Sequence, residues 1–208
     1  IASSPKVLYE RLGVKYAAYE MAVMVGKDGV EAFRRDKKKP PVHLYNHMLN
    51  AYSRVIPPPS STLTTDNKSN NNHPSLKHTI FVDESIRQKQ DQVASGADDV
   101  LNQMLQDEVE PNAKTFTALI YTFTKSNWLP EAHAMMEGLM DHLFNASASG
   151  VDKLEMVDIR CVRLLANALA KEGAADQVQQ IIFYLWALHE KGYYDVEPDI
   201  FLYTTALT

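Results

Sequence analysis

The sequence predicts an all-α fold in which pairs of helices repeat along the chain as a solenoid. Apolar residues recur at i, i+3, i+4 and i+7, the spacing of one helix face, and this spacing comes in two alternating forms. Turn-forming residues separate the two forms, and the pattern returns after about 35 residues plus insertions. Such a period is typical of helix pairs that each pack on their neighbours.

Composition agrees with a soluble globular protein. The chain has 208 residues, 45% of them apolar and 23% charged, which suffices for a sizeable core. Its single cysteine, Cys161, excludes an intramolecular disulfide and a four-cysteine zinc site, so a reducing compartment is expected. No apolar run reaches the length of about 18 residues that a membrane-spanning helix needs. Because the chain begins at Ile1 and stops inside a predicted helix, we expect a processed chain or part of a longer one.

The first two segments are the least regular. Residues 1–41 predict a degenerate helical repeat, with helices over 14–25 and 29–38 and the end of an earlier helix at 5–12. The first clear repeat spans 42–112. A low-complexity insertion at about 55–90 interrupts it, and this segment is too polar to order itself by burial.

Two further repeats and part of a fourth follow, over 113–158, 159–199 and 200–208. The first helices of the repeats carry apolar sets at the same spacing: Tyr45, Met48, Leu49 and Tyr52, then Phe116, Leu119, Ile120 and Phe123, then Val162, Leu165, Ala166 and Leu169. The second helices carry a longer set: Ala97, Val100, Leu101, Met104 and Leu105, then Ala132, Met135, Met136, Leu139 and Met140, then Val178, Ile181, Ile182, Leu185 and Trp186. These residues are predicted to form the core.

Several segments resemble the pentatricopeptide repeat family. Residues 113–140 match best, with Thr115 to Ile120 in the place of the family's first-helix signature and Leu129 to Ala132 at the start of its second helix. The signature returns at 44–46 and 202–204, and the second-helix ending at 104–112 and 196–199. The tetratricopeptide family shares this architecture at nearly the same length. The resemblance implies a right-handed superhelix whose groove holds single-stranded RNA, one base per repeat.

The resemblance also implies which residues would read bases. The pairs are Asn46 with Asn112, Thr117 with Asp158, Arg163 with Asp199, and Thr204 with a partner outside the chain. By resemblance, threonine with aspartate favours guanine, asparagine with asparagine favours a pyrimidine, and an arginine fits no code pair. Asn46 and Thr117 can equally be ordinary polar residues on a solvated helix face.

The predicted first helices are free of carboxylates. Residues 42–54, 113–126 and 159–171 contain no acidic and six basic residues, although the whole chain has 26 acidic and 21 basic ones. Because an uncompensated acid repels a phosphate, this distribution favours RNA. The candidate phosphate contacts are Arg54, Lys114, Lys125, Arg160, Lys171, Arg34, Arg35, Lys37, Lys38 and Lys39. The run from Arg34 to Lys39 is also typical of a solvated helix end.

No catalytic or cofactor chemistry is indicated. The sequence lacks a glycine-rich phosphate loop, a nucleophile elbow and a set of metal ligands with a general base. His43 and His47 stand four residues apart, but their helix offers no acidic residue and no third ligand, so we predict no metal site.

We therefore expect a non-catalytic RNA-binding subunit docked on a large RNA–protein assembly, such as a mitochondrial or plastid ribosome. Its partners would be single-stranded or ribosomal RNA and the neighbouring proteins of that assembly. The habit of the family implies the compartment. No transit peptide is visible in the sequence. The alternative is a helical-repeat scaffold of an organellar complex that binds proteins and has no RNA contact.

Overall fold

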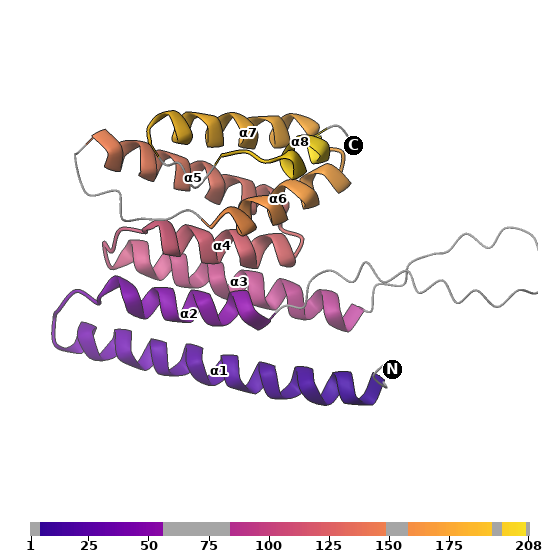
Figure 1. Ribbon diagram of the computed structural model, residues 1–208. Helices are drawn as coiled ribbons and strands as arrows, with labels where there is room; N and C mark the ends of the chain where they lie inside the picture. Colours follow the sequence, from indigo (N-terminus) through magenta and orange to yellow (C-terminus); the bar gives the residue numbers. More distant parts are fainter. Residues whose placement is uncertain (1–4, 56–83, 149–157, 193–196, 207–208) are drawn as a thin grey trace, which may run out of the picture.

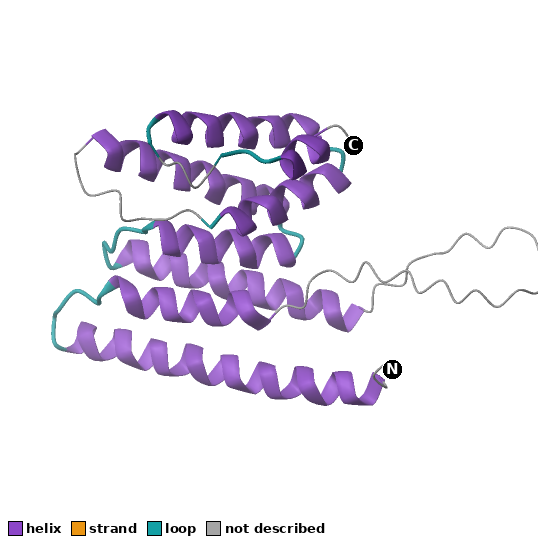
Figure 2. Cartoon of the chain, in the orientation of Figure 1, coloured by secondary structure: helices purple, strands orange, loops and turns teal. Residues whose placement is uncertain are grey.

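The computed structural model describes residues 5–55, 84–148, 158–192 and 197–206, and they form eight helices (Figure 1). The helices are α1 (Pro5–Arg35), α2 (Val42–Val55), α3 (Glu84–Gln106), α4 (Ala113–Lys125), α5 (Leu129–Ala148), α6 (Ile159–Lys171), α7 (Ala175–Glu190) and α8 (Ile200–Ala206). Turns and short connections join them within the described ranges (Figure 2). The all-α prediction is confirmed for this part of the chain.

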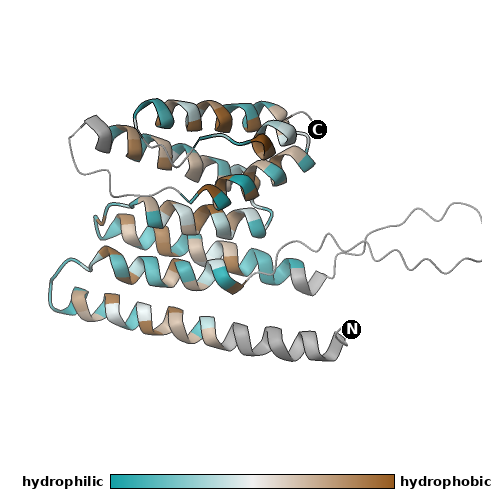
Figure 3. Ribbon diagram, viewed as in Figure 1, coloured by the Kyte–Doolittle hydropathy of each residue, from teal (hydrophilic) through white to brown (hydrophobic). Residues whose placement is uncertain are grey.

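The helices form a row of contacting pairs. Helix α2 contacts α4, α4 contacts α6, and α6 contacts α8, while α3, α5 and α7 pack against α2, α4 and α6 respectively. Helix α1 packs on α2 at one edge of the molecule, while α7 and α8 lie at the opposite edge (Figure 1). Each helix carries hydrophilic as well as hydrophobic residues (Figure 3), as expected of helices that bury one face.

The predicted first helices agree closely with α2, α4 and α6. Each begins at the predicted residue and ends within one residue of the predicted end. Their apolar sets are buried because the helical period places them on one face: Tyr45, Met48, Leu49, Leu119, Ile120, Val162, Leu165 and Ala166 are 0% exposed. The predicted core position Ala132 is also 0% exposed, whereas Leu105 and Trp186 are 53% and 40% exposed.

Helix α1 differs from the predicted pair of short helices, because residues 5–35 form one helix. Glycine in a helix interior costs only about 1 kcal/mol relative to alanine, which does not end a helix whose face is buried. Gly26 instead lets α1 approach α2: a Cβ at this position would lie 2.9 Å from Sδ of Met48 and nearer still to its Cγ. The helix ends three residues earlier than predicted, where Lys37 takes a positive φ of 54°.

The predicted insertion lies mostly at residues 56–83, outside the described residues. Its last part was predicted wrongly, because residues 84–90 belong to α3. The polar side chains there make contacts that sequence polarity does not indicate. Gln90 donates from Nε2 to the backbone oxygen of Lys125 at 3.3 Å, and Asp91 accepts from Nε1 of Trp128 at 3.0 Å. These two contacts lie ahead of Val93, the first residue of α3 that the core cluster includes, and they hold the early part of the helix against α4 and the turn that follows it.

Candidate nucleic-acid interface

The first predicted pair, Asn46 and Asn112, lies at the junction of α2 and α4. Asn112 caps α4, because its side-chain oxygen accepts from the backbone N–H of Thr115 at 3.1 Å. The same oxygen accepts from Nδ2 of Asn46 at 3.2 Å, and the hydroxyl of Thr115 donates to Oδ1 of Asn46 at 2.7 Å. Asn46 is only 7% exposed. The structure therefore brings the predicted pair together, but the amide of Asn46 is engaged within the protein.

The second predicted pair, Thr117 and Asp158, is replaced by a different contact. Asp158 caps α6, accepting from the backbone N–H of Arg160 at 3.0 Å, and it also accepts from the hydroxyl of Tyr121 on α4 at 3.4 Å. Tyr121 lies one helical turn beyond Thr117 on the same helix. Burial and then the Asp158 charge raise the pKa of Tyr121 to about 12.

The third predicted pair, Arg163 and Asp199, forms an ion pair between α6 and the start of α8. Asp199 immediately precedes α8 and accepts from the backbone N–H of Leu202 at 3.1 Å through its other oxygen. The Thr204 side chain is exposed, and its hydroxyl donates to the carbonyls of Ile200 and Phe201 in its own helix.

These junctions share one arrangement, which we call the cap bridges: Asn112 with Asn46, Asp158 with Tyr121, and Asp199 with Arg163. In each, the residue that begins a later helix accepts a backbone N–H of that helix and a side-chain donor from the preceding helix of the row. The bridging groups satisfy each other. A base could be read at Asn46 only if its bridge opened, because a buried amide makes few hydrogen bonds at once.

The solvent-facing sides of α2, α4 and α6 carry no carboxylate, because these three helices contain no acidic residue. Positions four, three and four residues apart lie on one helix face. On α2 these positions are His43, His47, Asn50 and Arg54, all exposed. We call the cations of the three helices on this side the basic stripe: Arg54, Lys114, Lys125, Arg160 and Lys171.

The five cations of the basic stripe differ in how free they are. Lys125 is half-buried, donates from Nζ to the backbone oxygen of Ser53 at 2.8 Å and lies 5.3 Å from the centre of the Tyr121 ring. Burial lowers its pKa. Lys125 is therefore a tie to the carboxyl end of α2, where a cation is favourable, rather than a free phosphate contact.

The other four cations of the basic stripe are exposed. Arg160 donates to Asp158 from Nε at 3.0 Å, so its charge is partly compensated. Arg54, Lys114 and Lys171 form no ion pair with any other described residue. One such cation lies on each of α2, α4 and α6.

The basic run at the end of α1 has mixed roles. Arg34 donates to Asp107, in the turn directly after α3, from Nε at 2.9 Å and from Nη2 at 2.6 Å, and the hydroxyl of Tyr45 donates to the same carboxylate. Burial disfavours the Asp107 charge, but these hydrogen bonds outweigh it and lower the Asp107 pKa. Arg34 thus ties the end of α1 to the turn that follows α3. Its neighbours Arg35, Lys37, Lys38 and Lys39 are exposed.

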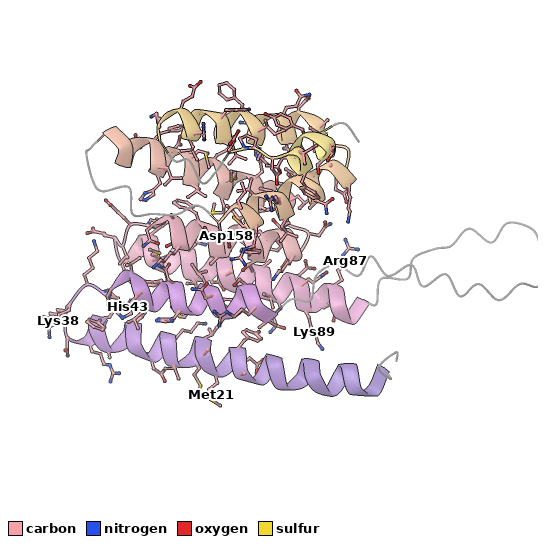
Figure 4. The ribbon with its side chains drawn as sticks, in the orientation of Figure 1. Met21, Lys38, His43, Arg87, Lys89 and Asp158 are labelled. Atoms are coloured by element: carbon pink, nitrogen blue, oxygen red, sulfur yellow. The ribbon has the colours of Figure 1, made fainter. Side chains whose placement is uncertain are left out.

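The basic run and the amino end of α2 lie at one end of the helices. Figure 4 shows Lys38 near His43 there, and Arg87 and Lys89 of α3 at the other end. His43 and His47 meet edge to face with ring centres 6.1 Å apart. Among the described residues, no three His, Cys, Asp or Glu side chains are grouped so that they could hold a metal ion. Cys161 is fully buried, and burial raises its thiol pKa to about 12.

Sequence reasoning missed the roles of Tyr121 and Asp107. Tyr121 stands four residues after Thr117 on the same helix face, so helical spacing could have offered it as a partner of Asp158. The contact of Asp107 with Arg34 joins residues 73 positions apart, and no local signal indicates it.

Comparisons with known proteins add no family to this picture. No protein-family model matches the chain, and a search of curated proteins finds no significant match. None of the helices in the described ranges has both the length and the apolar character to cross a membrane. The pentatricopeptide resemblance therefore stays a prediction that depends on the repeat residues themselves.

Proposed function

We propose that this chain is a non-catalytic RNA-binding subunit of a large RNA–protein assembly in a mitochondrion or plastid, such as the organellar ribosome. The observation that carries the proposal is the basic stripe, in which three neighbouring helices present cations and no carboxylate in a chain with an acidic excess. A surface of this kind attracts phosphates whatever the net charge of the protein.

The cap bridges bear on how RNA would be held. Their side chains are hydrogen-bonded or ion-paired to each other rather than free to contact bases. Arg163 with Asp199 also fits no base code, so recognition of a long RNA sequence base by base has little support. We infer recognition of the RNA backbone and shape by a short right-handed solenoid, with bases read only where a bridge opens. Docking on a structured RNA suits this mode better than selecting one transcript.

A protein-binding scaffold without RNA contact is the second candidate, and exposed apolar side chains favour it. Met21, Met24 and Val25 on the outer side of α1 are 62%, 57% and 63% exposed. Contiguous exposed apolar residues of this kind mark protein contacts in many proteins. The two candidates differ in what salt does to binding, since a phosphate contact weakens with salt and an apolar contact does not.

The test reverses three cations of the basic stripe together: Arg54→Glu, Lys114→Glu and Lys171→Glu. All three side chains are exposed and unpaired with other described residues, so the variant should fold. The matched control is Arg87→Glu with Lys89→Glu, two exposed cations on α3 at the end of the molecule away from the basic run (Figure 4). Binding to a labelled single-stranded RNA is followed by fluorescence anisotropy over a salt series.

We expect the triple variant to lose at least about tenfold in affinity at moderate salt. Its log–log salt slope should fall by about 2, since each lost phosphate contact to a single strand is worth about 0.7. The control should keep both quantities. Unchanged binding by the triple variant would refute the role of the basic stripe, and salt-independent recovery of proteins alone from an organelle extract would favour the scaffold.

A further inference from the structure

A second cationic surface lies on the other side of α2 from the basic stripe. On α2, the side chain of Met48 lies against Gly26 of α1. Tyr52 lies in the same way against Gly96 of α3, so both helices pack on the buried side of α2. Residues two positions apart lie on roughly opposite sides of a helix, so the exposed Arg54 faces away from α1 and α3. The groove between α1 and α3 is therefore separate from the basic stripe, and both of its walls are described helices.

A hollow of about 520 Å³ opens in this groove, and we call it the α1–α3 hollow. One face of α1 forms most of its lining, because positions three and four residues apart lie side by side on a helix. The lining residues are Lys27, Val30, Glu31, Arg34 and Arg35 of α1 and Gln103 of α3. The four charged side chains are exposed, while Val30 is buried. Three cations and one carboxylate thus face the same hollow.

The three cations have donors to offer a ligand. Lys27 and Arg35 form no ion pair with any other residue that the structure describes. Arg34 is bonded to Asp107 through Nε and Nη2, and within the described ranges its Nη1 makes no hydrogen bond. Because Asp107 already fixes the guanidinium, Arg34 loses little side-chain freedom when a ligand binds to Nη1. Asp107 is itself compensated by Arg34, which leaves Glu31 as the one uncompensated carboxylate of the lining.

The lining residues indicate which kind of anion fits. Arginine and lysine side chains suit a phosphate. None of the six lining residues is aromatic, so the α1–α3 hollow offers no ring on which a nucleobase would stack. Glu31 only accepts hydrogen bonds, and it repels an anion unless the ligand also brings a donor. The ribose–phosphate backbone of RNA brings both, because its 2′-hydroxyls are donors that lie beside its phosphates.

The basic run extends the α1–α3 hollow into a track that suits a polymer. Arg35 lines the hollow, and the exposed Lys37 and Lys39 follow it in the connection to α2. Neither lysine is ion-paired to another described residue. Lys38 lies near His43, the first exposed residue of α2 on the side of the basic stripe (Figure 4). Exposed cations therefore join the hollow to the basic stripe around one end of α1 and α2, which a single phosphate or mononucleotide would not use.

We propose that the α1–α3 hollow binds the ribose–phosphate backbone of RNA, as the continuation of the strand that the basic stripe contacts. Lys27, Arg34 and Arg35 contact phosphates, and Glu31 accepts from a ribose 2′-hydroxyl. The inference rests on the proposed function and deepens it, since the strand then bends around the connection between α1 and α2. An acidic peptide is a poorer occupant, because its carboxylates bring no hydroxyl to Glu31.

Two variants of the whole chain test the inference. Lys27→Glu with Arg35→Glu reverses two exposed cations of the α1–α3 hollow and leaves the bond between Arg34 and Asp107 in place. Glu31→Ala removes the acceptor. Because this change also relieves repulsion of phosphates, its readout is the ratio of the affinities for RNA and DNA rather than either affinity alone.

The matched control is Arg87→Glu with Lys89→Glu, which changes the net charge by the same amount on exposed residues of α3. Binding is followed by fluorescence anisotropy over a salt series. The probes are a labelled single-stranded RNA, a DNA of the same sequence and a polyglutamate peptide. Circular dichroism checks that each variant stays helical.

We expect Lys27→Glu with Arg35→Glu to bind RNA at least about tenfold more weakly at about 0.1 M salt. Its log–log salt slope should fall by about 1.4, since each lost phosphate contact to a single strand is worth about 0.7. The control should keep both quantities. The unmodified chain should prefer RNA to DNA, and Glu31→Ala should bring the two affinities closer together.

RNA binding that the double reversal in the α1–α3 hollow leaves unchanged overturns the inference. The proposed function survives that result if the triple variant of the basic stripe still loses affinity, and it fails only if the unmodified chain binds no RNA or the triple variant binds as well. An unchanged ratio of RNA to DNA affinity in Glu31→Ala overturns the ribose contact. Binding of polyglutamate that the double reversal abolishes also overturns the inference, by assigning the hollow to an acidic peptide.

Discussion

Two glycines of α1 should respond in opposite directions to the same substitution. Gly26 and Gly29 both lie inside the helix and both face α2, but the space around them differs. A Cβ at Gly29 would lie 3.5 Å from the methyl carbons of Leu44, which is ordinary contact. A Cβ at Gly26 would lie 2.9 Å from Sδ of Met48 and closer to its Cγ.

The magnitudes follow from two opposing effects. Replacing glycine by alanine inside a helix stabilises it by about 1 kcal/mol at either position. At Gly26 the new methyl also overlaps Met48, which is fully buried and cannot move into solvent. Overpacking of a buried site costs about 1–3 kcal/mol. We therefore expect Gly29→Ala to raise the free energy of unfolding by up to about 1 kcal/mol, and Gly26→Ala to lower it by about 1 kcal/mol.

Urea unfolding followed by circular dichroism measures both variants against the unmodified chain. Thermal melting is a second readout, since 1 kcal/mol corresponds to about 2–4 °C for a protein of this size. If both variants are stabilised equally, α1 does not approach α2 at Gly26. The single long helix would still stand, because alanine stabilises a helix interior; destabilisation at both positions would instead favour the pair of short helices predicted from the sequence.

Two further predictions concern polar contacts. Asn112→Ala should lower the free energy of unfolding by about 2 kcal/mol, because it removes the cap of α4 and leaves the amide of Asn46 without its acceptor. The control is Asn102→Ala, which removes an exposed hydrogen bond and should cost under about 0.5 kcal/mol. A double-mutant cycle of Asn112→Ala with Asn46→Ala, measured by urea unfolding, would contradict the bridge if the two substitutions showed no coupling energy. Asp107→Asn should reduce the loss of stability on acidification. Because the pKa of Asp107 is lowered in the folded state, its carboxylate contributes to the free energy of unfolding above about pH 4, and this contribution disappears as the pH falls through the lowered pKa. Equal acid sensitivity of the two proteins in thermal melts would show that the contact with Arg34 adds nothing.

Helical spacing sufficed to place α2, α4 and α6 in the sequence. It was less reliable in predicting which apolar residues of the other helices are buried. The sets around Tyr45 and Val162 are buried as predicted, since burial of one face is what the spacing reports. The same spacing predicted Leu105 and Trp186 in the core, and both are exposed. Periodicity shows that a helix has an apolar side, but what lies against each turn of that side depends on neighbours far away in the sequence.

The candidate site was predictable in its residue types and less so in its contacts. Counting carboxylates along the chain identified α2, α4 and α6 as acid-free, which depends only on composition. Whether a cation on these helices can contact a phosphate depends on geometry. The ammonium group of Lys125, for example, donates to the backbone oxygen of Ser53 instead. Asp158 bonds Tyr121 rather than Thr117 because the partner is chosen by the packing of α6 on α4. Helical spacing places Thr117 and Tyr121 on the same face of α4, and only the tertiary packing decides between them.

The cap bridges have a consequence for how the molecule comes apart. A helix usually frays at its first turn with little effect elsewhere. Here the residue at the start of a helix also holds a side chain of the preceding helix, so fraying at Asn112 or Asp199 releases Asn46 or Arg163 as well. Local unfolding of one helix is then coupled to local unfolding of the preceding helix of the row. Amide exchange should accordingly report protection that changes in blocks of two helices rather than helix by helix.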